Sequence, residues 1–456
     1  MPITAHGRYS LVSSCVLALC AAFSSACSST DGGEPPTSGA GASSGGSSAT
    51  GGNAPSAGTP GVAGAGATAG TPAGGGGAGA GGLPSVGGAA GASGAGGAVQ
   101  TGGAAGAAGS AAGSGGSPGG VCRPKFASGV NVAWINFAND IPNPDITKFT
   151  ALFKNVKAAG GSAVRWWFHT TGMTTPGYDA SGKAKPISAE NIADVKKILD
   201  AASAEGVGVV ISIWSFGMLD SGQTSNADVL ANNKLLLEND TNRQAYIDNV
   251  LTPLVTALKG YHGLFAWEIF NEPEGMSSDN GGWTNPQASR TAAVNLQKTV
   301  NWFTSAIHNA DPTALVTNGA NNFSTLSPSK GKNLWSDAAL LAAGSKANGT
   351  LDFYEVHYYN TWNGANAFSP FLHPVSYWGL DKKVVIGEFW TDLTDGVAAA
   401  DLYTNLYGNQ YSGAWAWQYV SPDNPGPTSG AVTIWPAMQV PMNNLKTAHA
   451  ADLTCP

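Results

Sequence analysis

The sequence predicts an α/β protein, a (β/α)8 TIM barrel that occupies residues 121–456. Short apolar runs alternate there with helical patterns eight times, as parallel strands joined by crossover helices require. A length of about 335 residues suits one such barrel with inserted loops. A doubly wound open sheet is the alternative. It is weakened by the count of eight, and because no glycine-rich phosphate loop follows the first strand.

Each expected strand is a short apolar run that alternates with an amphipathic helical pattern. Residues 207–214 are almost all apolar, which is typical of a strand buried on both faces of a parallel sheet. The expected strands are 128–134, 162–167, 207–214, 264–270, 315–318, 351–357, 383–387 and 413–417. The expected helical segments are 145–159, 188–206, 243–258, 289–310, 336–343, 369–378, 398–407 and 438–448.

Residues 1–30 are predicted to be an export signal. Their apolar run at 11–23 is too short to span a bilayer. The small residues before Cys27 resemble a bacterial lipobox, although Ser24 stands where leucine is usual. We therefore expect Cys27 to be lipidated and the protein to be an outer-membrane or cell-surface lipoprotein. The alternative is an ordinary cleaved signal with an incidental cysteine, which would make the protein secreted.

Residues 31–120 are predicted to be a disordered linker built from Gly, Ala, Ser, Thr and Pro. They hold more than half of the 63 glycines and no aromatic residue, lysine or arginine. Such a segment cannot bury enough apolar surface to offset the entropy lost on ordering. It is therefore expected to act as a flexible tether.

Two further cysteines, Cys122 and Cys455, mark the two ends of the predicted barrel. Because barrel closure brings the first and last elements together, and exported proteins meet an oxidising compartment, we expect these two to form a disulfide. Two free thiols are the alternative. No cysteine or histidine spacing in the chain suggests a structural metal.

Catalytic residues of such barrels lie at the C-terminal ends of the strands. Glu272 and Glu388 stand at the ends of the fourth and seventh strands, which face each other across the mouth. Hydrolysis of a glycosidic bond needs two carboxyl groups, one to protonate the leaving oxygen and one to attack carbon or activate water. A separation of about 5–5.5 Å would retain the anomeric configuration. Tryptophan and tyrosine at neighbouring strand ends would suit the apolar faces of sugar rings.

The stretches WEIFNEP (267–273) and VVIGEFW (384–390) resemble the acid/base and nucleophile motifs of clan A glycoside hydrolases, most closely glycoside hydrolase family 5. The similarity covers most of 125–450 and includes SAVRWWFHT (162–170) and DFYEVHYY (352–359). It implies the same barrel, and cleavage of β-1,4-mannans or β-1,4-glucans with retention.

The resemblance also implies a role for each matching residue. Glu272 would be the general acid/base and Glu388 the nucleophile. Substrate-binding or supporting roles would fall to Asn271 at the sugar 2-hydroxyl, Arg165 near the nucleophile, the pair His357 and Tyr359, and Trp417 as a stacking platform. His169 and Trp390 are added as substrate-binding candidates from their positions near strand ends.

Two more carboxyl groups near these motifs are expected to be structural. Glu268 is assigned to the strand face opposite Asn271, and is expected to support the barrel rather than act as a third catalyst. Glu355, two positions before His357, is read in the same way.

The expected partner is therefore a polysaccharide. The net charge of −7, with no basic run, argues against nucleic acid or anionic lipid as the main partner. We expect a monomer without metal or organic cofactor that meets a membrane only through its lipid anchor. β-Mannan is the first expected substrate, with β-glucan (an endoglucanase) as the alternative. A non-catalytic polysaccharide-binding protein and a transglycosylase remain further alternatives.

Overall fold

The computed structural model describes residues 123–360, 366–390, 395–419, 435 and 437–454. The predicted signal at 1–30 with Cys27, the predicted linker at 31–120, and both cysteines of the expected disulfide, Cys122 and Cys455, lie outside the described residues. These assignments stay predictions.

Eight parallel strands form a closed barrel in sequence order, which confirms the predicted fold class. They are β1 (Ala127–Ala133), β2 (Ala163–Thr170), β3 (Gly208–Ser215), β4 (Leu264–Asn271), β5 (Val316–Ala320), β6 (Tyr354–Tyr358), β7 (Val384–Phe389) and β8 (Gly413–Ala416). The ring closes where β1 pairs with β8, in the register Ala127↔Gly413. Every strand residue is buried, because side chains fill the interior and helices cover the outside.

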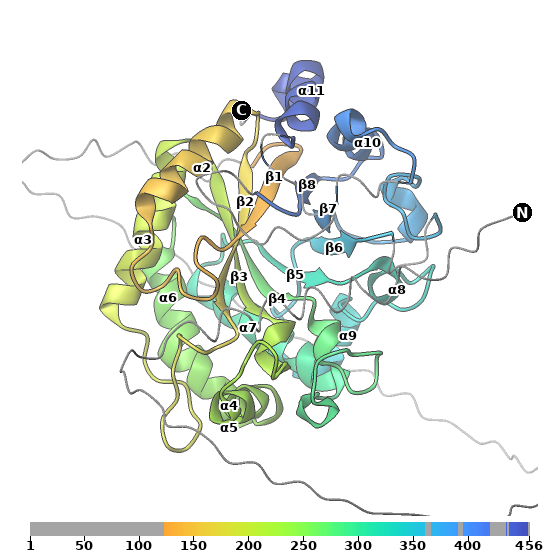
Figure 1. Cartoon of the computed structure of the whole chain (residues 1–456). Coiled ribbons are helices and arrows are strands. Elements are labelled where there is room, and N and C mark those ends of the chain that lie inside the picture. Colours follow the sequence, from red (N-terminus) through yellow and green to blue (C-terminus); the bar gives the residue numbers. More distant parts are fainter. Residues whose placement is uncertain (1–122, 361–365, 391–394, 420–434, 436, 455–456) are drawn as a thin grey trace, which may run out of the picture. The chain divides into compact units, whose positions relative to one another are not determined.

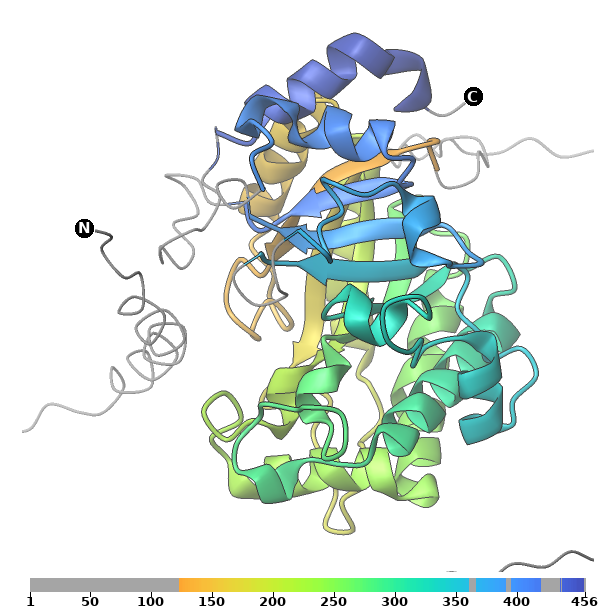
Figure 2. The same ribbon diagram turned by 90° about the vertical axis from the view of Figure 1, so that its right-hand side faces the viewer.

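The helices form a ring around the barrel (Figure 1). They are α2 (Ile146–Ala158), α3 (Ala189–Ala204), α4 (Ala227–Glu238), α5 (Asp240–Tyr246), α6 (Thr252–Leu258), α7 (Ala293–Ala310), α8 (Phe323–Leu326), α9 (Asp337–Gly344), α10 (Leu402–Gly408) and α11 (Gln439–His449). The last helix returns to the first, since Lys446 on α11 donates to the carbonyl of Ala158. Figure 2 shows the strands from the side, with α11 at one edge of the barrel.

The first helix illustrates how the sequence encodes this ring. Helix α2 begins after Asp145, whose carboxylate accepts from the backbone N–H of Lys148 and so caps the helix. Its buried residues follow helical spacing and form one stripe against the barrel: Phe149, Leu152, Phe153 and Val156.

Predicted elements and observed elements differ mainly between β3 and β4. The segment predicted as one helix at 243–258 is instead α5, a π-helical turn (Ile247–Leu251) and α6. Helix α4 was not predicted, because its buried face includes the polar Asn233 and so lacks a clear apolar period. The helix predicted at 369–378 is only a 3-10 turn, Val375–Trp378. Within the described part of the chain, no helix combines the length and apolar character needed to cross a bilayer.

Candidate active site

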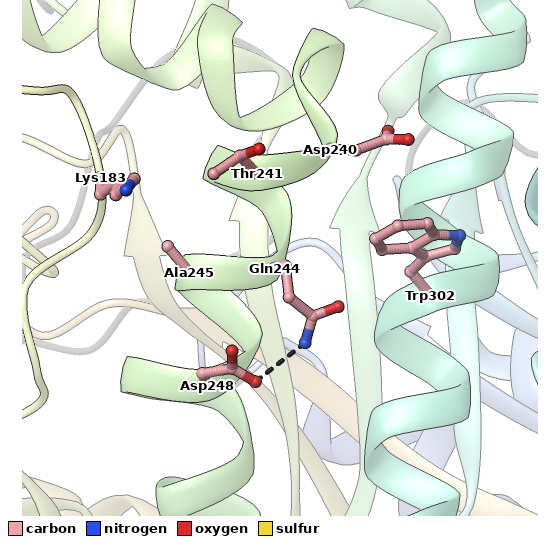
Figure 3. A pocket seen from close by; sticks show the side chains of 7 residues that line it. All are labelled: Lys183, Asp240, Thr241, Gln244, Ala245, Asp248 and Trp302. Atoms are coloured by element: carbon pink, nitrogen blue, oxygen red, sulfur yellow. Dashed lines mark hydrogen bonds between the residues drawn. The ribbon is translucent and has the colours of Figure 1, made fainter.

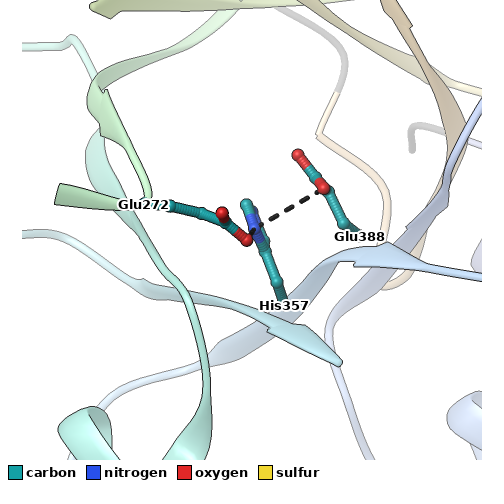
Figure 4. A group of neighbouring side chains, drawn as sticks. All are labelled: Glu272, His357 and Glu388. Carbon is teal, nitrogen blue, oxygen red and sulfur yellow. Dashed lines mark hydrogen bonds and ion pairs between the residues drawn. The ribbon is translucent and has the colours of Figure 1, made fainter. Parts of the chain in front are cut away.

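The C-terminal ends of β4, β6 and β7 bring together three side chains, Glu272, His357 and Glu388 (Figure 4). The Nδ1 atom of His357 lies 2.9 Å from Oε1 of Glu272 and 3.7 Å from Oε2 of Glu388. Carboxylate oxygens of the two glutamates and this nitrogen all lie within 4.8 Å of one another. The two carboxyl groups therefore flank one small space at the barrel mouth.

Glu272 reaches this space through an unusual backbone conformation. Strand β4 ends at Asn271, and Glu272 adopts φ 48° and ψ 56°, in the left-handed region that side chains other than glycine seldom occupy. Its N–H donates to the carbonyl of Gly319 on β5 at 2.8 Å, and Pro273 begins a 3-10 turn. Strain of this kind persists where the surrounding structure imposes it, which is frequent at active sites.

Arg165 on β2 lies at the centre of the barrel mouth with no exposed surface. Its Nη1 donates to Oε1 of Glu388 at 2.6 Å and to Oδ1 of Asn131 at 2.8 Å. Its Nη2 donates to Oε1 of Glu268 at 2.6 Å and to Oδ1 of Asn271 at 2.8 Å, and its Nε to Oε2 of Glu268 at 2.5 Å. All five N–H bonds are thereby used, which fixes the guanidinium against Glu388.

Hydrogen bonds from three further residues complete the support. The Tyr359 hydroxyl donates to Oε2 of Glu388 at 2.6 Å, near the nucleophile as the family resemblance implied for the pair His357 and Tyr359. Asn131 and Ser215 were not predicted. Asn131 binds Arg165, and Ser215 lies 3.2 Å from the side-chain amide of Asn271. An asparagine within the apolar run of the first strand is the sequence signal that could have revealed Asn131.

The environments of the two glutamates separate their protonation. Burial, and then the negative charge of Glu388, raise the pKa of Glu272 well above its usual value. Burial also raises the pKa of Glu388, but Arg165 and the hydrogen bond from Tyr359 oppose that rise. Glu272 thus holds its proton to a higher pH than Glu388, which is the order required of an acid/base and a nucleophile.

Aromatic side chains line one side of this space. Trp417, beyond the end of β8, is partly exposed and lies with its ring centroid 5.6 Å from that of Trp167 and 6.0 Å from that of Trp134. The ring centroid of Trp390 lies 4.6 Å from that of Tyr359. Trp134, which also contacts Phe137, was not among the predicted residues.

His169, which was predicted to bind substrate, is buried beneath the barrel mouth's surface. Its side chain is only 1% exposed, and its two ring nitrogens lie within hydrogen-bonding distance of Thr175 (2.8 Å) and Tyr246 (2.9 Å). Burial lowers the pKa of His169 to about 3, so its ring is neutral and packs between Trp214 and Phe168. The side chain of Trp214 is also buried and lines no open cleft.

Glu268 does not lie on the face opposite Asn271, because the pairing of β4 with β5 shifts register between these two residues. Both side chains point into the barrel and share Nη2 of Arg165. The prediction assumed that side chains alternate strictly between the two faces of the strand, and the register shift breaks this alternation. The ion pair of Glu268 with Arg165 is nevertheless consistent with a role in supporting the barrel.

The same three donors, Glu272, His357 and Glu388, could in principle hold a cation. However, His357 already binds Glu272, and Glu388 already binds the guanidinium of Arg165, which would repel a metal ion at this position. The arrangement fits proton transfer better than metal binding.

A second hollow, of about 440 Å³, lies on the outside of the helical ring between α5 and α7 (Figure 3). Two of its polar side chains bind within the protein: Gln244 donates to Asp248 at 2.8 Å, and the indole N–H of Trp302 donates to the carbonyl of Gly344 at 2.9 Å. It contains none of the predicted site residues, so the chemistry belongs to the barrel mouth.

Comparisons with known proteins agree with this geometry. Residues 126–422 match the profile of the family described as Cellulase (glycosyl hydrolase family 5). The chain belongs to glycosyl hydrolase family 5. It is therefore a glycoside hydrolase, as the two motifs and the barrel had led us to expect.

Curated relatives and solved structures give the same grouping. A mannan endo-1,4-β-mannosidase of Mytilus edulis is 33% identical over 314 residues, which cover 64% of this chain and 83% of the relative. A mannan endo-1,4-β-mannosidase of Cryptopygus antarcticus is 32% identical over 322 residues, which cover 65% of this chain and 81% of the relative. The structure of the β-mannanase from Mytilus edulis superposes with a TM-score of 0.63 and 30% identity, over 72% of this chain and 95% of that one. The structure of an endo-1,4-β-mannanase from Eisenia fetida superposes with a TM-score of 0.62 and 28% identity, over 72% of this chain and 95% of that one.

Proposed function

We propose that this family 5 enzyme is a retaining endo-β-1,4-mannanase. The observation that carries the proposal is the placement of Glu272 and Glu388, with carboxylate oxygens within 4.8 Å of each other across one space. Retaining glycosidases separate their carboxyl groups by about 5–5.5 Å, whereas inverting enzymes leave about 6.5–9.5 Å for a water molecule.

In the first step, Glu388 attacks the anomeric carbon while protonated Glu272 gives its proton to the leaving oxygen. Arg165 and Tyr359 favour the ionised form of Glu388, which is the form that attacks the anomeric carbon. In the second step, Glu272 takes a proton from water, and that water releases the sugar from Glu388. The partly exposed Trp417 offers a flat apolar face for the sugar ring.

The proposed substrate is β-mannan, because both curated relatives above 30% identity are named as mannan endo-1,4-β-mannosidases. β-Glucan is the competing substrate, since the matching family profile is named for cellulase. Release of reducing ends from β-mannan, glucomannan and carboxymethylcellulose, compared at equal enzyme concentration, tests the choice. We expect mannan to be cleaved fastest. Faster release from carboxymethylcellulose would make the protein an endoglucanase, and release from none of the three would contradict the proposal.

Replacement of Trp417 by alanine is expected to raise KM on β-mannan and to lower kcat/KM by roughly 10-fold or more. Loss of an aromatic side chain on which a ligand ring stacks costs about 1–3 kcal/mol of binding free energy. Trp134→Ala removes a neighbouring ring that contacts Trp417 and is expected to have a smaller effect in the same direction. Initial rates over a range of mannan concentrations measure both. An unchanged KM for Trp417→Ala would remove this residue from the binding surface.

We further propose that the enzyme is exported and that Cys27 anchors it through lipid, with residues 31–120 as the tether. The intact mass of the mature protein tests this, because lipidation leaves Cys27 as the modified first residue. A mature chain that begins elsewhere without added lipid mass would favour simple secretion.

A further inference from the structure

Four buried carboxyl groups surround the single guanidinium of Arg165. Glu268, Glu355 and Glu388 each place an oxygen within 3.0 Å of a guanidinium nitrogen, and Glu272 lies beside Glu388 at the mouth. If all four were ionised, three negative charges would stay uncompensated in a largely buried site. An uncompensated buried charge is strongly destabilising, so more than one of the four must carry a proton.

Glu355 receives the least hydrogen-bond support among the carboxyl groups around Arg165. The five N–H bonds of Arg165 go to other acceptors, Glu268 twice among them. Oε1 of Glu355 lies 3.0 Å from Nε of Arg165, yet neither carboxyl oxygen of Glu355 has a hydrogen-bond partner among the described residues. A carboxylate that accepts no hydrogen bond is far more costly to bury than a neutral acid.

The barrel leaves room for this group by omitting a side chain on the neighbouring strand. A Cβ atom built on Gly387 of β7 would lie 2.2 Å from Oε1 of Glu355, closer than any real contact. Gly387 immediately precedes Glu388, so the position beside the nucleophile is kept small and Glu355 occupies the space. Glu355 is thus enclosed next to the catalytic pair rather than directed away from it.

His357 presents an unpaired atom towards Glu355. Its Nε2 has no hydrogen-bond partner in the described part of the chain and lies 3.9 Å from Oε1 of Glu355, while its Nδ1 contacts Glu272. Burial, and then the charge of Arg165, lower the pKa of His357 well below its usual value, so its ring carries one proton. Which nitrogen holds that proton decides the direction of the hydrogen bond to Glu272.

We propose that Glu355 is a neutral carboxylic acid that donates its proton towards Nε2 of His357 and thereby fixes the histidine proton on Nδ1, facing Glu272. A shift of about 1 Å, or one bridging water, would close the gap to hydrogen-bonding distance. This assigns Glu355 as a positioning residue, which acts on the acid/base through His357 and keeps its own proton throughout.

The direction of this bond matters for the reaction proposed above, on which the inference rests. With the proton on Nδ1, His357 donates to one oxygen of Glu272, and the proton of Glu272 stays free for the glycosidic oxygen. After that transfer, the same N–H stabilises the Glu272 carboxylate. With the proton on Nε2, the ring would instead accept from Glu272 and compete with the substrate for its proton.

The charged neighbours of Glu355 are consistent with a retained proton. Burial, and then the charge of Glu268, raise the pKa of Glu355 well above its usual value, and Arg165 opposes this rise. The groups that face it are Arg165 from β2, Glu268 from β4, His357 from its own strand and Glu388 from β7. Because Arg165 is already neutralised by Glu268 and Glu388, little positive charge is left to ionise Glu355.

The tautomer of His357 can be measured directly in the full-length protein by ¹⁵N NMR of its ring, assigned by comparison with His357→Gln. We expect protonated Nδ1 and unprotonated Nε2 in the parent and in Glu355→Gln, whose amide N–H can replace the acid proton. Glu355→Leu is expected to lose this preference and to lower kcat on β-mannan by at least about tenfold, with a smaller change in KM. Glu355→Gln should recover most of that activity.

The pH dependence of kcat/KM provides a second readout, with Glu268→Gln as the matched control. Both substitutions remove a carboxyl group beside Arg165, but only removal of an ionised one should lower the pKa of Glu388 and move the acid limb to lower pH. We expect that shift for Glu268→Gln and none for Glu355→Gln. A shift for Glu355→Gln, or a parent His357 protonated on Nε2, would overturn the proposal even if Glu355→Leu fails to fold. Since the NMR measurement needs no substrate, failure of the parent on mannan would count against the proposed function alone.

Discussion

Replacement of Glu388 by alanine is expected to lower kcat on β-mannan by at least about 10³-fold, because no nucleophile remains to form the glycosyl–enzyme intermediate. Glu272→Ala is expected to cause a loss of about 10²–10⁴-fold, the range typical of general acid/base catalysis. Initial rates from reducing-end release on β-mannan measure both effects. Glu190→Gln, at an exposed carboxyl group on α3, is the control and should match the parent.

An aryl mannoside with a good leaving group separates the two roles. Such a leaving group needs no proton, so Glu272→Ala should still release phenolate in a burst and then turn over slowly. Glu388→Ala should show no burst, because the first bond to the enzyme cannot form. A burst from Glu388→Ala with none from Glu272→Ala would exchange the two assignments. Equal activity of either variant and the parent would remove that residue from catalysis.

The same pair predicts a bell-shaped dependence of kcat/KM on pH. The acid limb reports protonation of Glu388, and the basic limb reports loss of the proton from Glu272, whose pKa is raised by burial and by Glu388. Because the two carboxyl groups interact, the apparent pKa values of the acid and basic limbs describe the pair rather than either residue alone.

Replacement of Arg165 by methionine is expected to be the most destabilising substitution at the site. It leaves Glu268 without its bidentate partner, and Asn131 and Asn271 without a donor to their side-chain oxygens. Breaking a buried pair in this way costs about 3–5 kcal/mol. Because the pKa values of the remaining carboxyl groups rise, the deficit should be largest at neutral pH. It should shrink as the pH falls towards about 4, where these groups are protonated in the unfolded chain as well.

Urea unfolding at several pH values measures this loss, and Arg243→Met is its matched control. Arg243 is equally buried but lies on α5, paired with Asp240 and remote from the four carboxyl groups. Arg243→Met should destabilise the protein without moving the acid limb of kcat/KM. Any folded Arg165→Met should show an acid limb at higher pH, since Glu388 has lost its positive neighbour. Parent-like stability of Arg165→Met would contradict the assigned network.

Much of this architecture could be predicted from the sequence because it depends on local patterns. Apolar runs such as 207–214 indicated buried parallel strands, and the ends of β4 and β7 placed Glu272 and Glu388 at one mouth. The strands could be located because their residues are apolar in continuous short runs. The two glutamates could be placed at one mouth because all strands of a parallel barrel point in the same direction. Two glutamates more than a hundred positions apart could therefore be placed side by side from these patterns alone.

The rest depends on geometry that no period encodes. The register shift between Glu268 and Asn271 turned both side chains into the barrel, which alternation alone could not predict. His169 lies near the end of β2, the strand that also carries Arg165, yet its ring contacts Tyr246 rather than the catalytic glutamates. The π-helical turn at Ile247–Leu251 likewise divides what composition indicated as one helix.

Asn131 links the catalytic centre to the seam where the barrel closes. Its side-chain nitrogen lies 2.8 Å from the carbonyls of both Gly387 on β7 and Trp415 on β8, while its oxygen accepts from Arg165. One of the five hydrogen bonds that hold the guanidinium beside the nucleophile therefore forms through a residue fixed where the first strand meets the last two. A refolding chain should regain its helical circular dichroism before its enzymatic activity. Enzymatic activity therefore reports that the barrel has closed between β1 and β8. A chain shortened before β8 should be inactive even if it keeps much of its secondary structure.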